Sequence, residues 1–315
     1  MKKIISLITG GAGFIGSHIA HTLVKKGHNV IVFDDFSSGS LDNLKDIEKQ
    51  IKVIKGDITD FNQLKTAFKG VDYVYHHAAL VSVAESMSDP RKTQKINIEG
   101  ANNVLEAARI NGVKKVLLAS SSAVYGNGKE MPYREDGPTD CRSPYAASKL
   151  TGEELLKMYN KAYGLSTVIV RYFNVFGPGQ NPNSPYAAVI AKFMQCAEQG
   201  KEFCIDWDGK QSRDFVFVDD IVAATVLVMQ KGKAGEVYNI ASGKTYTLLR
   251  LASLIEALSG KKMKRVFKPK RAGDVKKSCA DISKIKKLGF RPAFTLEKGL
   301  KAMLQTKKTP KGTAR

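Results

Sequence analysis

The chain has 315 residues, of which 43% are hydrophobic and 25% charged, an ordinary globular composition that argues against wholesale disorder. No apolar run approaches the roughly 20 residues that a membrane-spanning helix needs. The start of the chain indicates a first strand rather than a signal peptide, because Gly10, Gly11 and Gly13 interrupt its apolar stretch too soon. The four cysteines lie far apart without a CxxC pair, so we expect no metal site and a reduced, cytoplasmic protein.

The net charge is +20, and residues 261–315 carry +16 of it, with 19 Lys or Arg against three acids. Such asymmetry is compatible with nucleic-acid binding. No zinc finger, RNP aromatic motif or basic helix-turn-helix accompanies it, so nucleic acid is an unlikely partner. We favour a solvated basic face, part of which serves an anionic small molecule.

Short apolar segments alternate with helical patterns through the first half of the chain. Such alternation predicts a parallel sheet covered by helices on both faces, with ligands at the carboxyl ends of the strands. The predicted strands lie near Lys3–Thr9, Val30–Asp34, Lys52–Lys55, Tyr73–His76, Lys115–Ala119 and Thr167–Arg171. The predicted helices lie near Phe14–Lys26, Asp60–Phe68, Arg91–Ile110 and Pro144–Tyr163.

The second half is less regular and predicts a smaller domain packed on the first. A loop rich in Gly, Pro and Asn leads to the next predicted elements. These are helices near Tyr186–Gln199 and Thr247–Leu258 and strands at Phe215–Val218 and Val237–Ile240. The basic tail 305–315 lacks an apolar anchor, so we expect it to fray.

The first predicted turn carries glycines at Gly10, Gly13 and Gly16, between a strand and a helix. Glycine lets the backbone approach a pyrophosphate, whose charge the helix N-terminus stabilises. Asp34 ends the second strand 18 residues after Gly16, where a carboxylate accepts hydrogen bonds from both adenosine ribose hydroxyls and repels a 2′-phosphate. No Lys or Arg follows until Lys45. The pattern therefore predicts NAD rather than NADP.

Further cofactor contacts are expected after the third and fourth strands. Asp57 and Ile58 reach the adenine edge, and Ala78 and Ala79 leave room for the cofactor because their side chains are small. The pair His76 and His77 sits at the end of the fourth strand, and we expect packed structural histidines rather than a base or a metal pair.

Three residues beyond the fifth strand carry the predicted chemistry. Tyr145 and Lys149 are four residues apart in YAASK and share one helical face, with Ser143 as N-cap and Pro144 as first helical residue. Lys149, the charge of NAD and the helix N-terminus are expected to lower the pKa of Tyr145, so that its phenolate takes a proton from a sugar hydroxyl as hydride leaves. Ser121 is expected to steady the developing carbonyl.

The chain resembles the extended short-chain dehydrogenase/reductases, the NAD-dependent epimerase/dehydratase family, and within it the UDP-hexose 4-epimerases, over nearly its whole length. The motifs that carry this resemblance are TGGAGFIG (Thr9–Gly16), SSSAVYG (Ser120–Gly126), YAASK (Tyr145–Lys149), RYFNVFGPGQ (Arg171–Gln180), RDFVFVDD (Arg213–Asp220) and RAGD (Arg271–Asp274). The resemblance implies 4-epimerisation of UDP-sugars through a 4-keto intermediate.

The resemblance also implies roles for individual residues. The implied cofactor contacts, besides those above, are Phe14, Ile15, Leu80, Asn97, Lys149 and Tyr172. Asn174, Arg213 and Arg271 are implied to hold the UDP diphosphate, for which guanidinium groups are suited, and Asp274 the uridine ribose. The implied substrate contacts around the sugar are Ser82, Ser121, Ser122, Tyr145, Gln180, Ala188, Val189 and Ser278.

Four positions bear on cofactor retention, on the reaction and on the sugars that are expected. Val81 replaces a lysine that several epimerases have near the cofactor, which implies weaker cofactor retention. Ser122 and Ala123 replace the acidic pair of the related 4,6-dehydratases, so dehydration is disfavoured. Ser278 stands where glucose-restricted epimerases have a tyrosine, and it leaves room for an N-acetyl group. We therefore expect activity on UDP-glucose and UDP-galactose, and on UDP-GlcNAc and UDP-GalNAc.

The expected architecture is a Rossmann-type doubly wound α/β fold. Residues 1–172 form the NAD-binding domain, to which the chain returns near 215–241, and residues 173–315 mainly bind the nucleotide sugar. A homodimer is implied, with contacts through the helices around Asn102–Ile110 and Ala147–Tyr159. The alternatives are another nucleotide-sugar epimerase or decarboxylase of the family, and a basic NAD-sensing or nucleic-acid-binding protein that kept the fold.

Overall fold

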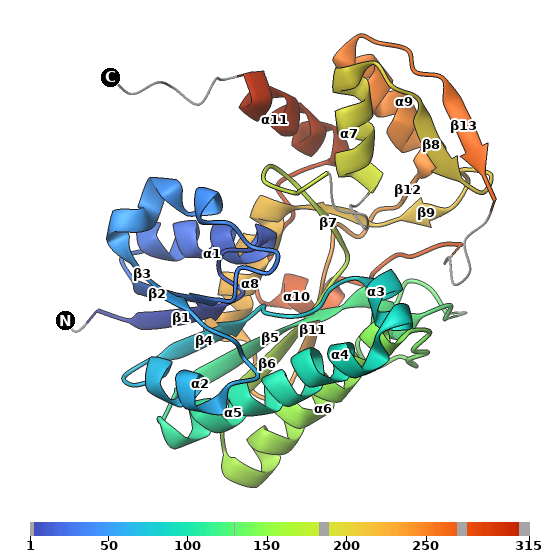
Figure 1. Ribbon diagram of the computed structural model, residues 1–315. Coiled ribbons are helices and arrows are strands. Elements are labelled where there is room, and N and C mark those ends of the chain that lie inside the picture. The colour runs from blue at the N-terminus through green and yellow to red at the C-terminus, as the bar shows by residue number, and fades with distance from the viewer. Residues whose placement is uncertain (1–2, 129, 183–188, 270–275, 309–315) are drawn as a thin grey trace, which may run out of the picture.

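The computed structural model describes residues 3–128, 130–182, 189–269 and 276–308. Its centre is a seven-stranded parallel sheet in the order β11-β6-β5-β4-β1-β2-β3 (Figure 1). The strands are β1 (Ile5–Thr9), β2 (Asn29–Asp34), β3 (Ile51–Lys55), β4 (Tyr73–His76), β5 (Lys115–Ser121), β6 (Thr167–Tyr172) and β11 (Val237–Ile240). The strand order reverses between β1 and β4, which is where doubly wound sheets bind ligands.

Helices cover both faces of this sheet because successive strand residues point to opposite sides. Leu7 of β1 is buried on one side and Ile8 on the other, and Val168 and Ile169 of β6 divide in the same way. On one side lie α2 (Phe61–Ala67), α5 (Gly100–Ile110) and α6 (Pro144–Tyr163), and on the other lie α1 (Phe14–Lys25) and α8 (Val218–Lys231). This arrangement confirms the predicted fold class.

Several helical regions differ from the prediction. The expected helix Arg91–Ile110 is divided into α4 (Pro90–Gln94), a π-helical turn (Lys95–Glu99) and α5, and it is preceded by α3 (Val83–Ser88). The long helix α8 was not predicted. Nine of its residues, among them Val218, Ile221 and Thr225, are buried, so it lacks the polar face that makes a helix recognisable in a sequence.

The smaller part of the molecule is built mainly from segments after Tyr172. It contains β7 (Asn174–Phe176), α7 (Val189–Gln199), β8 (Phe203–Asp206), β9 (Ser212–Arg213), β10 (Phe215–Phe217), β12 (Tyr246–Thr247), α9 (Leu248–Ser259), β13 (Arg265–Lys268) and α11 (Leu296–Lys308). α10 (Ser283–Lys287) instead packs against β11 of the central sheet. α11 buries Leu300 and Met303 and extends to Lys308, past residue 305, from which the tail is expected to fray; fraying itself stays a prediction.

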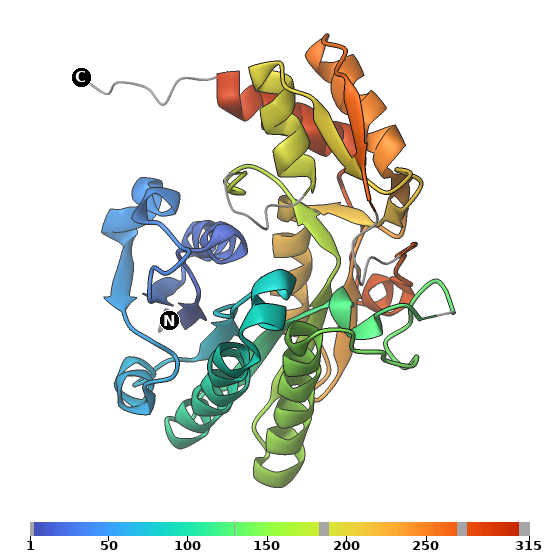
Figure 2. The same ribbon diagram turned by 45° about the vertical axis from the view of Figure 1, so that its right-hand side comes forward.

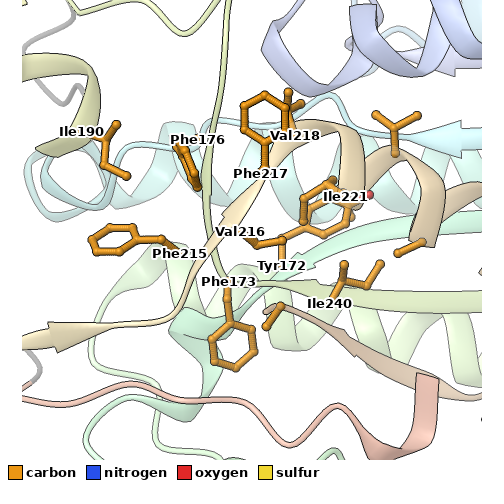
Figure 3. Close-up of a cluster of buried hydrophobic side chains, with 14 of the residues drawn as sticks. Tyr172, Phe173, Phe176, Ile190, Phe215, Val216, Phe217, Val218, Ile221 and Ile240 are labelled. Carbon is orange, nitrogen blue, oxygen red and sulfur yellow. The ribbon is translucent and has the colours of Figure 1, made fainter. Parts of the chain in front are cut away.

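A continuous hydrophobic core joins the two parts. In the turned view of Figure 2, α7 and α9 stand at one end of the molecule and α5 and α6 at the other. Figure 3 shows the core between them, where Tyr172, Phe176, Phe217, Val218 and Ile221 come from β6, β7, β10 and α8. Because this core is shared, β7 and β10 are held in a defined position beside the carboxyl ends of the sheet strands.

Candidate active site

The turn after β1 has the geometry of a phosphate-binding loop. Gly10 has φ +68°, in the left-handed region that favours glycine, and a side chain there would lie 2.6 Å from the backbone nitrogen of Ala78. A side chain on Gly16 would overlap the carbonyl oxygen of Gly10. α1 begins at Phe14 after Gly13, which offers no side-chain cap, so the first N–H groups of the helix are left for an anion.

Asp34 is the last residue of β2, and its side chain contacts this turn. It is 5% exposed, and its carboxylate accepts hydrogen bonds from the backbone N–H groups of Ala12 and Phe36, both at 2.9 Å. Burial raises the pKa of Asp34, while these two N–H groups lower it. Farther along the same edge, Asp57 is exposed and Ile58 is buried against Gly100. The close-packed glycine turn and the anchored acid fit a dinucleotide.

The segment after β4 is held by the side chain of Asn97, which is buried on the π-helical turn. Its Oδ1 accepts a hydrogen bond from the Leu80 N–H at 2.8 Å, and its Nδ2 donates to the Leu80 carbonyl at 3.0 Å and to Ser148 Oγ at 3.0 Å. The side chain of Asn97 therefore fixes the backbone of Leu80, which follows Ala78 and Ala79.

The two histidines of β4 and the segment after it make hydrogen bonds inside the protein. His76 Nδ1 lies 2.7 Å from Thr9 Oγ1, and His77 Nε2 lies 2.9 Å from the hydroxyl of Tyr172, which in turn lies 2.7 Å from Thr225 Oγ1. Burial lowers the pKa of His76 and of His77 to about 3 each, so both rings are neutral at physiological pH. A packed, neutral pair agrees with the structural role predicted for them.

Tyr145, Lys149 and Ser121 come together at the carboxyl end of β5. Ser143 caps α6 by accepting the Ala146 N–H at 3.1 Å, with Pro144 as the first helical residue, as the sequence predicts. Lys149 Nζ lies 5.9 Å from the centre of the Tyr145 ring and donates to the Ala119 carbonyl at 2.9 Å. Ser121 ends β5 and hydrogen-bonds Tyr145. The predicted catalytic group is thus brought together by β5 and α6.

The protein groups around Tyr145 by themselves raise the pKa of its phenol, so the expected lowering rests on the charge of NAD. Burial raises the pKa of its phenol, and the hydrogen bond with Ser121 lowers it only in part. Burial also lowers the pKa of Lys149 to about 8, against the opposing effect of Glu153. The reason is that both groups are taken out of water, which disfavours the charged form of each.

A cavity of about 300 Å³ lies between β7, α7 and β8 to β10. Its lining includes Asn174, Val189 and Arg213, three of the predicted substrate residues. It also contains residues that sequence analysis missed, namely Val175, Phe176, Ile190, Cys204, Asp206, Gln211, Phe215 and Leu248. Most of these residues belong to no recognisable sequence motif. They can be identified only in the folded chain, where separate segments come together.

The remaining predicted sugar contacts are partly described. Ser82 is buried and caps α3 by accepting the Glu85 N–H at 3.0 Å, and Ser122 follows β5 at the start of a short 3-10 helix. Gln180 Nε2 donates to the Val175 carbonyl at 3.2 Å. Ser278 is buried, and its N–H donates to the carbonyl of Ser212, next to Arg213. Ala188, Arg271 and Asp274 lie outside the described residues.

One buried acid that organises the substrate side was also missed. Asp214 follows Arg213 and is fully buried, and its carboxylate accepts hydrogen bonds from Ser242 and Gly243 and, at 3.4 Å, from the Ala280 N–H. Burial raises its pKa to about 6. Asp214, the acid in RDF, could have been recognised from the sequence as a structural residue, because a polar side chain next to an apolar strand needs hydrogen-bond partners when it is buried.

Comparison with known proteins decides the family. The model of the "NAD dependent epimerase/dehydratase family" matches residues 6–241. The chain belongs to this family. The match confirms the resemblance seen in the sequence, the assignment as an enzyme of the epimerase type, and NAD as cofactor.

Relatives of this epimerase-family protein cover nearly its whole length. A putative UDP-glucose 4-epimerase of Methanocaldococcus jannaschii is 36% identical, with 95% of this chain and 96% of that protein aligned. Among solved structures, a UDP-N-acetylglucosamine 4-epimerase from Methanobrevibacter ruminantium, in complex with UDP-N-acetylmuramic acid, is 40% identical over 97% of this chain and 98% of the other, with a TM-score of 0.93. The UDP-glucose 4-epimerase of Thermotoga maritima, solved with UDP-glucose, is 38% identical over 97% and 99%, with the same TM-score.

Members with other activities are also similar to the chain. A UDP-N-acetyl-α-D-glucosaminuronate decarboxylase of Bacillus cytotoxicus is 37% identical over 97% of this chain and 98% of that protein. Within the described residues, no helix combines the length and the apolar character needed to cross a membrane.

Proposed function

We propose that this protein interconverts UDP-hexoses by 4-epimerisation, with the 4-keto sugar as intermediate. The observation that carries the proposal is the meeting of Tyr145, Lys149 and Ser121 at the carboxyl end of β5, in the same parallel sheet whose strand β1 ends at the glycine turn. The printed activities of the aligned 4-epimerases support the same reaction.

The chemistry follows from the side chains present. Tyr145 accepts the proton of the sugar 4-hydroxyl, and Ser121, hydrogen-bonded to Tyr145, donates to the developing carbonyl oxygen. Lys149 favours the phenolate form of Tyr145 when it is charged. Gly13 and Asp34 would hold the pyrophosphate and the adenosine ribose of NAD, which would supply a reversible hydride acceptor for carbon 4 of the sugar. Turning of the 4-keto sugar between oxidation and reduction would give the epimer.

The diphosphate of the substrate is assigned to the cavity beside β9. Arg213 supplies a guanidinium there and Asn174 an amide, a pairing suited to phosphate oxygens. By resemblance, Arg271 and Asp274, outside the described residues, complete the contacts to diphosphate and ribose. The strongly basic second half of the chain is in keeping with an anionic substrate.

We further propose that the sugar pocket accepts N-acetylhexosamines as well as hexoses. Ser278 is small and is attached through its backbone to β9, beside Arg213, so it leaves volume that a tyrosine would fill. Steric room admits the larger substrate without excluding the smaller one, because a smaller group in a roomy pocket loses only modest contact energy. Ser278→Tyr should suppress turnover of UDP-GlcNAc much more than turnover of UDP-galactose.

The test is incubation of the purified protein and NAD with UDP-galactose, without added reductant, followed by detection of UDP-glucose. UDP-GlcNAc is tested in parallel, with UDP-GalNAc as the expected product. Absence of UDP-glucose would refute the reaction. Turnover of UDP-galactose without any turnover of UDP-GlcNAc would refute the pocket-size argument alone.

We also propose a homodimer through the outer faces of α5 and α6, which pack against each other. Three large hydrophobic side chains on them, Ile110, Met158 and Tyr163, are exposed in the single chain. Light scattering after size-exclusion chromatography should give twice the chain mass, and Met158→Asp should shift the protein towards the monomer. A wild-type protein of single-chain mass at micromolar concentration would contradict this.

A further inference from the structure

A buried carboxylate lies one helical turn beyond Lys149 and has no part in the chemistry above. Glu153 is 0% exposed, and its spacing on α6 places it on the face that carries Tyr145 and Lys149. Its Oε2 accepts a hydrogen bond from Arg171 Nη2 at 2.7 Å, and its Oε1 accepts one from Arg171 Nε at 2.9 Å and one from Ser120 Oγ at 2.5 Å. Arg171 is itself 3% exposed.

These contacts tie α6 to the ends of the two strands beside it. Ser120 of β5 and Arg171 of β6 are direct partners in the sheet. Ser120 lies between Ala119, whose carbonyl accepts the hydrogen bond from Lys149, and Ser121, which hydrogen-bonds Tyr145. The carboxylate of Glu153 therefore fixes the backbone segment that contacts both catalytic side chains on α6.

The charges around Lys149 are unevenly distributed. His76 at the end of β4 and His77 just after it face Lys149 and are neutral. On β5, Lys149 contacts the uncharged carbonyl of Ala119. On its own helix it faces the phenol of Tyr145 and the carboxylate of Glu153. Glu153 is thus the anion that stabilises the ammonium of Lys149.

The guanidinium of Arg171, on β6, holds the carboxylate of Glu153 in place. It lies 4.8 Å from the centre of the Tyr125 ring and donates to the Glu135 carbonyl at 3.3 Å, so it is held independently of Glu153. A buried ion pair such as Glu153–Arg171 adds little to the net stability of a fold compared with apolar residues of the same volume. Stability alone therefore does not explain this pair, whereas the electrostatic effect of Glu153 on Lys149 suggests a functional role.

We propose that Glu153, held by Arg171 and Ser120, is a positioning residue that keeps Lys149 as an ammonium and Ser121 aligned with Tyr145. The inference deepens the proposed epimerase function and rests on it for its kinetic consequence. Its electrostatic part concerns the protein alone and is measurable without substrate.

The test is the substitution Glu153→Gln, which retains size and hydrogen-bond acceptor but removes the charge. The ionisation of Lys149 is followed by NMR of protein labelled with ¹³C at the lysine Cε, and Lys149 is assigned by its absence in Lys149→Met. Removal of a negative charge one helical turn away should lower the pKa of Lys149 by about one unit or more. The positive charge of Arg171, which Glu153 no longer neutralises in this variant, should lower it further. The alkaline limb of the epimerase pH profile should move down by a similar amount.

Two further variants separate this role from a merely structural one. Glu153→Asp retains the charge and should leave the Lys149 titration close to that of the wild type. Glu202→Gln is the matched control, because it removes the carboxylate of an exposed ion pair with Lys264, 2.8 Å long and remote from α6. It should alter neither the titration nor the pH profile.

If Glu153→Gln fails to fold, the double variant Glu153→Gln with Arg171→Met still answers the question, because no unpaired charge is left buried. Its Lys149 midpoint should lie below that of the wild type. A Lys149 titration unchanged in Glu153→Gln or in the double variant would overturn the proposal. An absence of epimerase activity in the wild type, with the NMR shift present, would instead refute the proposed function and leave the electrostatic role of Glu153 standing.

Discussion

His76 should make the stability of this protein depend on pH in acid. The ring is 3% exposed beside Thr9, and burial lowers its pKa to about 3, whereas an unfolded histidine titrates near pH 6.5. The unfolded chain therefore binds a proton that the folded chain does not accept. The stabilisation from keeping His76 neutral is complete above pH 6.5 and is lost progressively as the pH falls towards 3.

The magnitude follows from these two values. At pH 5.0 the folded ring is still neutral, while about 97% of unfolded chains carry the proton, which corresponds to a loss of about 2 kcal/mol relative to pH 7.5. Any folded pKa below about 4 leads to the same figure. The substitution His76→Gln removes the titration and retains an acceptor for the Thr9 hydroxyl.

The assay is urea denaturation of the wild type and His76→Gln at pH 7.5 and at pH 5.0. The free energy of unfolding of the wild type should fall by about 2 kcal/mol more between these two pH values than that of the variant. A constant offset between the two proteins reports the altered hydrogen bond and does not bear on the reasoning. Equal losses in both proteins would show that His76 is protonated in the folded state, contrary to its burial.

Three further outcomes are expected. Tyr145→Phe should lower turnover by roughly 100-fold or more, since proton transfer contributes about 10²–10⁴, while NAD affinity measured by calorimetry is retained; near-native turnover would remove Tyr145 from its role. Gly16→Ala should abolish NAD binding or folding, because its methyl group would overlap the Gly10 carbonyl, and normal NAD affinity in a folded variant would contradict the tight turn. Deletion of residues 309–315, past the end of α11, should leave UDP-galactose turnover unchanged, and a loss of activity would make this basic segment a functional element.

The elements and residues that depend on local spacing can be predicted from the amino-acid sequence alone. The glycines of the first turn, the Ser143 cap and the four-residue step from Tyr145 to Lys149 act within one turn or one helix, and the structure has them where the spacing predicts. The strands of the first half were equally readable, because parallel strands buried on both faces appear as short continuous apolar runs.

Features that depend on burial and on the meeting of distant segments become visible only in the folded protein. α8 was missed because burial on most of its surface removes the polar face that marks a helix. The cavity combines residues of β7, α7, β8, β9, β10 and α9, which no spacing relates to one another. The raising effect of burial on the pKa of Tyr145 also came only from the structure, since the cost of burying a charge depends on the surrounding atoms and not on the neighbouring sequence. For the same reason, the pairing of Glu153 with Arg171 became visible only once α6 lay on β5 and β6.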